Sequence, residues 1–472
     1  MKLLKTLTMG ALLAASIGIA SAAPTTVIHI SGSTAFRAGV QQAILDYLTT
    51  ESGGNAPTYA WKGNASVLKA SASCFLSNDG TIGVETYWSG SVAGVIDLVC
   101  QNQLVNKFPD VNNNTLNNAV ATTLNTEASA PVDFAWTDAT FGSAAATVSG
   151  ANIATGSTTT GTATTGAQLS ALITGAGLKE AGTAGQTTSG QGIVPFAWFA
   201  GATSISGGTP FTNFTTEYAR AMITSGTIPL SFATGNSADD TKFIYNVQRA
   251  EDSGTRENSL LNAFFPVGNA PKSYQLAFSN NQTVLTDPNF PSGLNTGGVT
   301  VANGPAVVTS ASLWAGNLEM NTNTNISWSG TGHYGYIGGG DVANVLSATN
   351  PANLNIPAGP KGPLGVANTG EFFVGVLGIS DGGTVLTNGG TILNWNGVPY
   401  TAANLQNGLY TFWGYEHAYL LPTVSADLKN VANGIANTVY NGDATTNGGG
   451  VLINSAVLVK KTGDGGAISK NY

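Results

Sequence analysis

The chain has 472 residues, of which only 9% are charged, and its formal net charge at pH 7 is -8. This length is enough for two or three domains of ordinary size. The negative charge and the absence of a basic stripe argue against a nucleic-acid partner, because such proteins neutralise phosphates with clustered Lys and Arg.

The first 22 residues have the pattern of a secretory signal peptide. Two lysines precede an apolar run from Leu7 to Ala20, and small residues follow up to Ala22, as a signal peptidase requires. The apolar run is too short to cross a bilayer, and no cysteine follows it that could carry a lipid. We therefore expect cleavage after Ala22 and a periplasmic or secreted protein.

Cys74 and Cys100 are the two cysteines of the chain. In an exported protein an even pair predicts one disulfide, although two buried free thiols remain the alternative. The histidines are His29, His333 and His417, and the sequence contains neither a CxxC nor an HExxH pattern. We therefore expect no metal site and no cofactor.

Strands alternate with helices along the chain. A strand at Thr26–Ile30 leads through a Gly/Ser turn to a helical pattern from Ala35 to Leu48, for which Ser33 or Thr34 would be the N-cap. The same order returns at residues 84–99 and 243–265. This alternation predicts an α/β protein.

Two stretches, residues 142–192 and 279–332, are poor in charge and rich in Gly, Thr, Ser, Ala or Asn. Their low complexity predicts surface insertions, formed by loops or added strands. A short helical pattern, Ala167–Leu178, lies inside the first of them.

Three strand-to-helix turns are rich in Ser, Thr and Gly. The start of a helix offers unpaired N–H groups and a partial positive charge, so each turn could bind an anion, although helix capping alone would explain any single one. Arg249 lies four residues before Ser253 in the third turn, and its planar guanidinium suits an oxyanion. Asp138, at the end of a fourth strand, is either a turn cap or an acceptor in a pocket of donors.

These four segments resemble, in order and spacing, the periplasmic phosphate-binding proteins of ABC transporters. Residues 31–36 are similar to that family's Gly-x-Gly-x-Thr-Phe turn, and residues 89–95 to its Gly-Ser-Ser-Gly-Gly-Val turn. Residues 133–139 are similar to its Asp-Phe-Gly-Ala-Ser-Asp-Ala segment. Residues 249–255 resemble Arg-x-Asp-x-Ser-Gly-Thr most closely, with Glu251 in place of the family's Asp.

The resemblance implies an α/β, two-lobed periplasmic binding protein of type II (Venus-flytrap), with a mixed sheet in each lobe and a two-strand hinge. Residues 23–192 would form the first lobe and residues 193–364 the second, and residues 365–472 would return to the first. The residues that the resemblance places on inorganic phosphate are Thr34, Ala35, Ser91, Asp138, Arg249, Ser253, Gly254 and Thr255.

The function implied is phosphate binding outside the cytoplasm, either for the membrane permease of an ABC transporter or as a scavenger. Such a protein is a monomer and not an enzyme. The alternatives are binding of another tetrahedral oxyanion, or a cell-surface or structural role that reuses the fold. The retention of Ser91, Asp138, Arg249 and Ser253 together favours anion binding.

Residues 378–382 fit the G-x-S-x-G motif of serine hydrolases. The residues that follow are strand-like, whereas that motif requires a strand-to-helix elbow. No Asp lies between Asp381 and His417 to complete a triad. We therefore interpret this segment as a turn.

Overall fold

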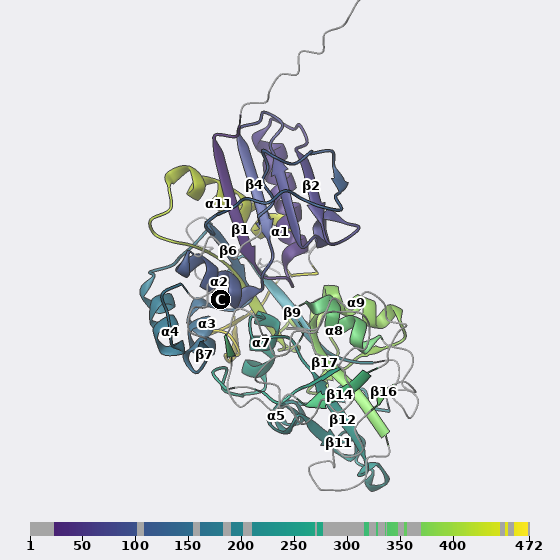
Figure 1. Ribbon diagram of the computed structural model, residues 1–472. Coiled ribbons are helices and arrows are strands. Elements are labelled where there is room, and N and C mark those ends of the chain that lie inside the picture. The colour runs from purple at the N-terminus through teal and green to yellow at the C-terminus, as the bar shows by residue number, and fades with distance from the viewer. Residues whose placement is uncertain are drawn as a thin grey trace, which may run out of the picture.

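The computed structural model shows two lobes stacked one above the other (Figure 1). It describes residues 23–101, 108–153, 161–182, 190–201, 210–269, 271–276, 316–320, 327–328, 336, 338–347, 354–355, 370–443, 449–451 and 457–470. One mixed sheet of 16 strands runs through both lobes, in the order β16-β14-β13-β12-β17-β9-β20-β6-β1-β4-β3-β2-β5, with β11, β18 and β8 attached at its sides.

The first lobe is built on three parallel strands, β6-β1-β4, continued by antiparallel pairs on the outer side. Because the three strands are parallel, their carboxyl ends lie at one edge of the sheet. The strands are β1 (Thr26–Gly32), β2 (Thr58–Lys62), β3 (Ala72–Leu76), β4 (Ile82–Tyr87), β5 (Ala119–Val120), β6 (Phe134–Thr137) and β8 (Lys179–Glu180).

Helices cover both faces of this sheet. Side chains alternate between the faces along β6: Phe134 and Trp136 pack in the core shared with α1 and α11, whereas Ala135 packs in the core shared with α2, α3 and α4. The helices are α1 (Arg37–Glu51), α2 (Ser91–Cys100), α3 (Phe141–Ser149), α4 (Gly166–Gly175) and α11 (Ala426–Thr438).

The second lobe has the parallel strands β12 and β17 at its centre. Its strands are β11 (Thr227–Pro229), β12 (Lys242–Val247), β13 (Tyr274–Leu276), β14 (Gly316–Met320), β16 (Leu354–Asn355), β17 (Gly370–Gly378) and β18 (Thr391–Ile392). Its helices are α5 (Thr216–Ser225), α6 (Ser231–Thr234), α7 (Gly254–Asn262), α8 (Gly339–Leu346) and α9 (Ile379–Thr387).

Two strands, β9 (Gly192–Ala200) and β20 (Trp413–Leu420), cross between the lobes. They pair with each other in antiparallel fashion, and each then continues into the sheet of one lobe, β9 beside β17 and β20 beside β6. Smaller elements complete the chain: η1 (Val67–Lys69), β7 (Asn152–Ile153), β10 (Asn213–Phe214), η3 (Ser237–Asp239), β15 (Ser327–Trp328), β19 (Asn394–Trp395), α10 (Ala402–Gln406), η5 (Val439–Asp443), β21 (Val459–Lys461) and β22 (Ile468–Lys470).

The predicted fold class, two α/β lobes with a mixed sheet in each, is confirmed. Three details differ from the prediction. Helix α1 begins at Arg37 and has no side-chain cap, while the Ser33 hydroxyl accepts a hydrogen bond from the N–H of Phe36 at 3.3 Å in the turn before it. Strand β17 and helix α9 belong to the second lobe, so the chain returns to the first lobe at β20 and not at residue 365.

The segment 142–192 is more than the surface insertion that its composition predicts. It contains most of α3 and all of α4, which confirms the short helix expected there. Ala144, Val148, Leu169 and Ile173 are buried against α2 in one core cluster. Small side chains let these helices approach closely, which explains the Ala-rich sequence. Most of residues 279–332 lie outside the described residues, as do residues 1–22.

Cys74 and Cys100 are free thiols, so the predicted disulfide is wrong. Cys74 lies on β3 and is buried in a small cluster with Ala60 and Val111. Cys100 is the last residue of α2 and packs against the separate cluster of α2, α3 and α4. The two thiols therefore pack in separate clusters and are not bonded to each other.

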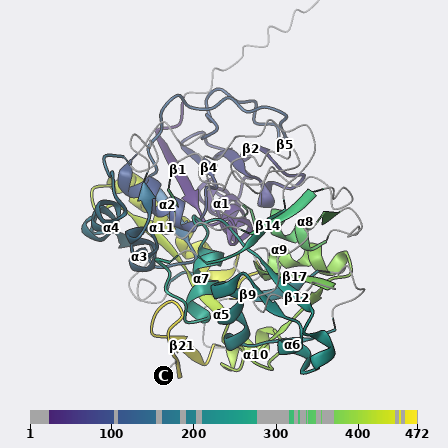
Figure 2. The ribbon, with the colours of Figure 1, turned by 60° about the horizontal axis from the view of Figure 1, so that its bottom comes forward.

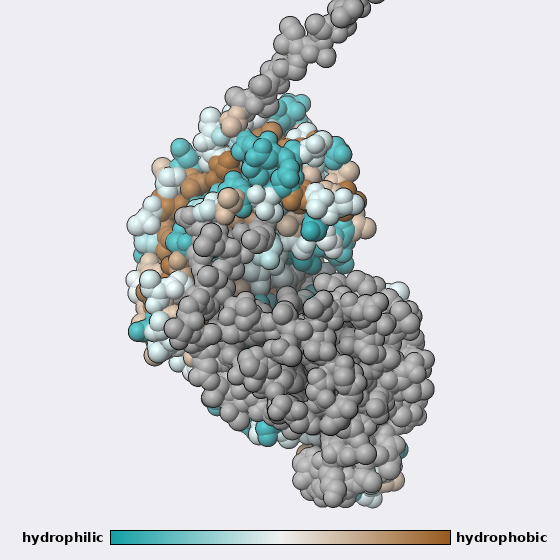
Figure 3. Space-filling view, viewed as in Figure 1, coloured by the Kyte–Doolittle hydropathy of each residue, from teal (hydrophilic) through white to brown (hydrophobic). Residues whose placement is uncertain are grey.

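Within the part of the chain that the structure describes, no helix combines the length and the hydrophobicity needed to cross a bilayer. On the face of the first lobe that Figure 3 shows, hydrophilic and apolar residues lie side by side.

Gly32 is a position where a side chain would overlap the backbone of a neighbouring strand. Its φ is +123°, and a Cβ there would lie 1.8 Å from the carbonyl oxygen of Trp136. We expect Gly32→Ala to lower the free energy of unfolding by at least about 3 kcal/mol, because steric overlap adds to backbone strain. Denaturant unfolding would measure the loss.

Gly54→Ala is the matched control. Its φ is +94°, but no atom lies within 4 Å of the added Cβ. It should lose only about 1 to 2 kcal/mol, the cost of the backbone conformation alone. Equal losses in the two variants would show that the contact with Trp136 does not constrain this turn.

Candidate functional site

Three turns of the first lobe meet at the carboxyl edge of its sheet. They follow β1, β4 and β6 and lead into α1, α2 and α3. Hydrogen bonds join them: the N–H of Gly90 donates to the carbonyl of Gly32 at 2.9 Å, and the N–H of Ser33 donates to the carbonyl of Trp136 at 2.7 Å. The hydroxyls of Ser31 and Ser89 lie 2.8 Å apart. The three helix starts are therefore held in one rigid assembly.

The second lobe presents the turn after β12 to this assembly, and in Figure 2 α7 lies beside α2 and α3. The N–H of Val92 donates to the carbonyl of Asp252 at 3.0 Å. The side-chain amide of Asn258 donates to the backbone carbonyl of Asp138 at 2.5 Å. A Cβ on Gly254 would overlap the Asp138 carboxylate, so this glycine lets the start of α7 lie directly over Asp138.

Arg249 spans the two lobes. Its Nε donates to the carbonyl of Tyr336 at 3.0 Å in the second lobe, and its Nη2 donates to Thr34 Oγ1 at 3.2 Å in the first. The residue is 2% exposed. A guanidinium is always protonated, so it brings a full positive charge to the junction between the lobes.

Asp138 is the acceptor of the site. It is 1% exposed, and the Ser91 hydroxyl donates a hydrogen bond to its Oδ1. Its Oδ2 has no hydrogen-bond partner among the described residues. Burial raises the pKa of Asp138 to about 6, against the opposing effects of the Ser91 hydrogen bond and the Arg249 charge.

Further buried carboxyl groups surround this acceptor. Glu257 on α7 and Glu416 on β20 are 2% and 0% exposed. Burial, together with neighbouring acidic groups that include Asp138, raises the pKa of each well above its ordinary value. Burial therefore favours the neutral acid in both groups, and a neutral carboxyl group can donate a hydrogen bond as well as accept one.

The structure brings five of the eight predicted site residues into direct relation. Thr34 contacts Arg249, Ser91 contacts Asp138, and Gly254 lies over both Ser91 and Asp138. The other three lie near the same turns. Ala35 faces Gly378, and Thr255 is buried in the first turn of α7. Ser253 is the N-cap of α7, since its hydroxyl accepts from the N–H of Arg256 at 3.3 Å.

The start of α9 was not predicted as part of this region. Residues 378–382 form a strand-to-helix junction, and the interpretation of this segment as a simple turn is wrong. The error came from assigning residues 383–386 to a strand, because short apolar runs do not distinguish helix from strand. The Asp381 carboxylate acts on the charge of Arg37, a second cation close to Arg249 that was also not predicted.

Arg37 is the first residue of α1, and its pKa is lowered mainly by burial, while Asp381 opposes this effect and Arg249 adds to it. Its position directly after the first Gly/Ser turn is the signal that could have identified it. Two arginines from opposite lobes therefore lie within electrostatic reach of each other.

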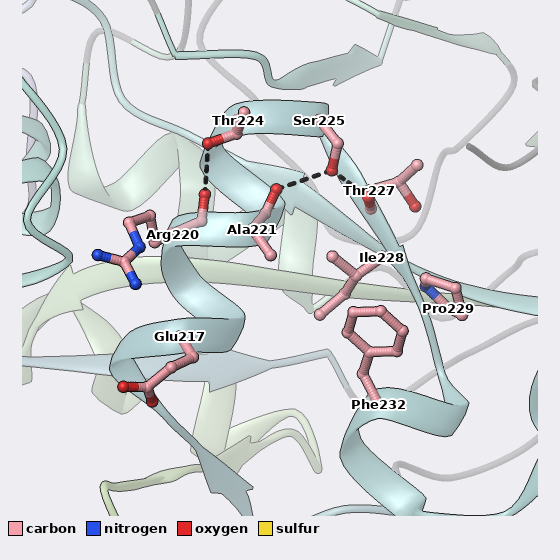
Figure 4. A pocket seen from close by; sticks show the side chains of 9 residues that line it. All are labelled: Glu217, Arg220, Ala221, Thr224, Ser225, Thr227, Ile228, Pro229 and Phe232. Carbon is pink, nitrogen blue, oxygen red and sulfur yellow. Dashed lines mark hydrogen bonds between the residues drawn. The ribbon is translucent and has the colours of Figure 1, made fainter. Parts of the chain in front are cut away.

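A groove of about 500 Å³ lies elsewhere in the second lobe, between α5, β11 and α6 (Figure 4). Phe232 and Ile228 form its apolar side, and Glu217 and Arg220 stand at its rim. None of the residues that line it belongs to the turns described above. The groove is therefore separate from the junction between the lobes.

No protein-family model matches the sequence, and no curated protein matches it. Solved structures show a distant likeness. One, provisionally described as a phosphate ABC transporter substrate-binding protein with bound phosphate from Clostridium perfringens, has a TM-score of 0.41 at 11% identity, over 91% of this chain and 100% of that one.

Two further structures are similar at the same level. PstS from Borrelia burgdorferi gives a TM-score of 0.33 at 13% identity, over 87% of this chain and 92% of its own. An ABC-type phosphate transport receptor from Vibrio cholerae gives a TM-score of 0.35 at 10% identity, over 87% of this chain and 93% of its own. These likenesses are too distant to assign a family or a ligand to this chain.

The raised pKa of Glu416 makes the stability of the fold depend on pH. Its pKa is raised in the folded protein, so the unfolded chain loses this proton first, and stability falls as pH rises above the ordinary value of Glu, about 4.3. Gln cannot ionise. We expect Glu416→Gln to raise the melting temperature at pH 8 by about 2 °C or more, since each tenfold change in proton affinity is worth about 1.4 kcal/mol.

The gain should shrink toward pH 4, where Glu416 is neutral in both states. Melting curves of the ligand-free protein at several pH values would measure it, with the exposed Glu217→Gln as the control that shows no such trend. A gain that is constant with pH would contradict a raised pKa of Glu416.

Proposed function

We propose that this chain binds inorganic phosphate between its two lobes, as the extracytoplasmic solute-binding component of a phosphate ABC transporter. The observation that carries the proposal is the meeting of Arg249 and Thr34 from opposite lobes beside a buried Asp138. This arrangement offers a full positive charge, hydroxyl donors and one acceptor, and the helices α2 and α7 begin at the same place. Helix starts, hydroxyls and guanidinium groups together suit a tetrahedral oxyanion.

Each predicted ligand has a distinct role in this proposal. Arg249 supplies paired N–H donors, and Thr34, Ser91 and Thr255 supply hydroxyls. Ala35 and Gly254 supply backbone N–H groups, and the absence of a side chain on Gly254 allows close approach. Ser253 holds the first turn of α7 through its capping hydrogen bond. Closure of the lobes on the β9–β20 hinge would bury the anion, a hinge-type transition.

Asp138 favours phosphate over other tetrahedral oxyanions. Near neutral pH phosphate keeps at least one proton, whereas sulfate keeps none. A buried carboxylate accepts a hydrogen bond from the phosphate proton but faces only lone pairs on sulfate. An unpaired buried acceptor costs about 1 to 3 kcal/mol, and more when it is charged.

A purely structural role does not account for this set of residues. Burying a charge is costly unless it is paired, and well-packed apolar side chains stabilise as well or better. Arg249 and Asp138 are 2% and 1% exposed. A binding site explains why such groups are retained at the junction between the lobes.

The remaining parts of the proposal follow from the same role. The mature protein would be exported by the signal peptide of residues 1–22 and would act as a monomer. Its partner would be the membrane permease of the transporter, which would receive the anion from the closed form.

Arg249→Met should abolish phosphate binding. Charge-assisted hydrogen bonds are worth roughly 1.5 to 3 kcal/mol each, so the loss of two corresponds to at least about a hundredfold weaker affinity. Calorimetry with phosphate would measure it. The exposed Arg220→Met is the matched control and should bind within about twofold of the wild type.

Arg249→Lys tests the same point if the methionine variant unfolds. It keeps the charge but loses the planar fork, so it should remain folded and bind phosphate at least about tenfold more weakly. Binding within a few-fold of the wild type by a folded Arg249 variant would show that the phosphate site lies elsewhere.

The preference for phosphate over sulfate should depend on pH through the protonation of Asp138. Its pKa of about 6 in the unliganded protein means that it is charged at pH 8 and neutral at pH 5. The neutral acid can donate a hydrogen bond to sulfate. We therefore expect sulfate affinity to rise roughly tenfold or more between pH 8 and pH 5, as an unpaired acceptor becomes a donor.

Asp138→Asn should bind sulfate more tightly at pH 8 and show little change with pH, because an amide donates at either value. Competition binding with both anions would measure the preference, with the exposed Asp240→Asn as control. If Asp138 only caps a turn, its variant loses stability and keeps the selectivity and the pH dependence of the wild type.

A further inference from the structure

A second group of ionisable side chains lies in the first lobe, outside the turns of the proposed phosphate site. It consists of His29 on β1, Glu85 on β4 and Glu127 in the loop between β5 and β6; we call it the His29 cluster. His29 and Glu85 are direct register partners on neighbouring parallel strands, so their side chains point to the same face. One nitrogen or oxygen atom from each of the three residues lies within 4.8 Å of the others.

Asp133 fixes the orientation of the imidazole. Its Oδ2 lies 2.9 Å from His29 Nδ1 and accepts the backbone N–H of His29 at 2.9 Å. A carboxylate only accepts hydrogen bonds, so Nδ1 carries the proton and Nε2 is free to act as a ligand. Metal-binding histidines are commonly held in this way by a carboxylate behind the ring.

His29 Nε2 points at two carboxylates. It lies 3.5 Å from Glu85 Oε2 and 3.5 Å from Glu127 Oε2. His29 is 8% exposed, and Nε2 has no hydrogen-bond partner among the described residues. These separations are too long for hydrogen bonds, yet they are the spacing of ligands that surround one small cation.

Glu85 is also prepared for a cation. The residue is fully buried, its Oε1 accepts the N–H of Val111 at 2.8 Å, and its Oε2 has no hydrogen-bond partner in the described part of the chain. Burial raises the pKa of Glu85 to about 8, although the Val111 hydrogen bond and His29 oppose this effect. Burial lowers the pKa of His29, but Asp133 and the nearby glutamates outweigh it.

The cluster is open on one side. The Glu127 side chain is 25% exposed, which leaves a path from solvent. Its backbone N–H donates to the carbonyl of Phe108 at 2.9 Å, and the Phe108 ring packs on the His29 ring with centroids 5.1 Å apart. An apolar wall therefore covers one side of the imidazole, and the partly exposed Glu127 lies where the cluster borders the solvent.

We propose that His29, Glu85 and Glu127 bind a divalent first-row transition metal ion, for which Zn²⁺ is the best-suited candidate. One imidazole and two carboxylates, with water at the open position, form a ligand set that Zn²⁺ accepts in tetrahedral geometry. The ion would tie the loop that carries Glu127 to β1 and β4, so its role is to stabilise the first lobe.

Calorimetric titration of Zn²⁺ into tag-free, chelator-treated protein in phosphate-free buffer tests the proposal. We expect one ion per chain and a higher melting temperature with Zn²⁺. His29→Gln should weaken binding at least about a hundredfold and remove the thermal shift. Asp133→Asn should weaken it by about 10 to 100-fold, because the imidazole loses its orientation.

His417→Gln is the matched control. His417 is likewise buried, with Nδ1 3.0 Å from Glu180 Oε1, but it is not part of the three-ligand group. This variant should keep the Zn²⁺ affinity of the wild type within about twofold.

Glu127→Gln decides the question if His29→Gln unfolds, since Glu127 is partly exposed and its replacement keeps the shape. It should weaken Zn²⁺ binding at least about tenfold and leave phosphate affinity unchanged. Absence of stoichiometric binding to the wild type, or undiminished binding by folded Glu127→Gln, would overturn the proposal. Neither result depends on whether the cleft binds phosphate.

Discussion

The close approach of β1 to β6 is the constraint on which the junction between the lobes depends. Gly32 lies against the carbonyl of Trp136, and Ser33 donates its N–H to that same oxygen. The contact draws the ends of two parallel strands together, and the Gly32 carbonyl then accepts from Gly90, which adds the third turn. The missing side chain of Gly32 is therefore one condition for the convergence of the three helix starts.

The charge balance at this junction depends on the burial of its carboxyl groups as much as on the pairing of opposite charges. Arg249 lies near several carboxyl groups, but burial raises the pKa of Glu257 and of Glu416 well above the ordinary value, which weakens their tendency to cancel its charge. A net negative chain can in this way present a locally positive site. Long-range repulsion of anions is then offset at short range by helix dipoles and by the guanidinium groups of Arg249 and Arg37.

The sequence predicted what depends on local pattern. The strand-turn-helix units around Gly32, Ser91 and Gly254 were recognisable because capping and turn residues report the backbone beside them. Contacts between distant segments were not recognisable from the sequence, and nothing in it showed that the two cysteines lie in separate clusters. Helix α9 was predicted as a strand because an apolar run of four residues fits the helical period and the strand period equally well. His29, Glu85 and Glu127 lie on separate elements with no common spacing, so no motif could reveal them.

The ribbon of β9 and β20 is the sole place where two adjacent strands of the described chain pass from one lobe to the other. It pairs Trp413 with Pro195, but the next residue, Phe196, donates its N–H to the carbonyl of Phe412 at 3.1 Å, so the proline occupies a non-hydrogen-bonded position and interrupts no bond of this ladder. Two-stranded ribbons twist more strongly than wide sheets. Any relative rotation of the lobes should therefore be a twist of this ribbon, and small angles there become large displacements at the distant tips of both lobes.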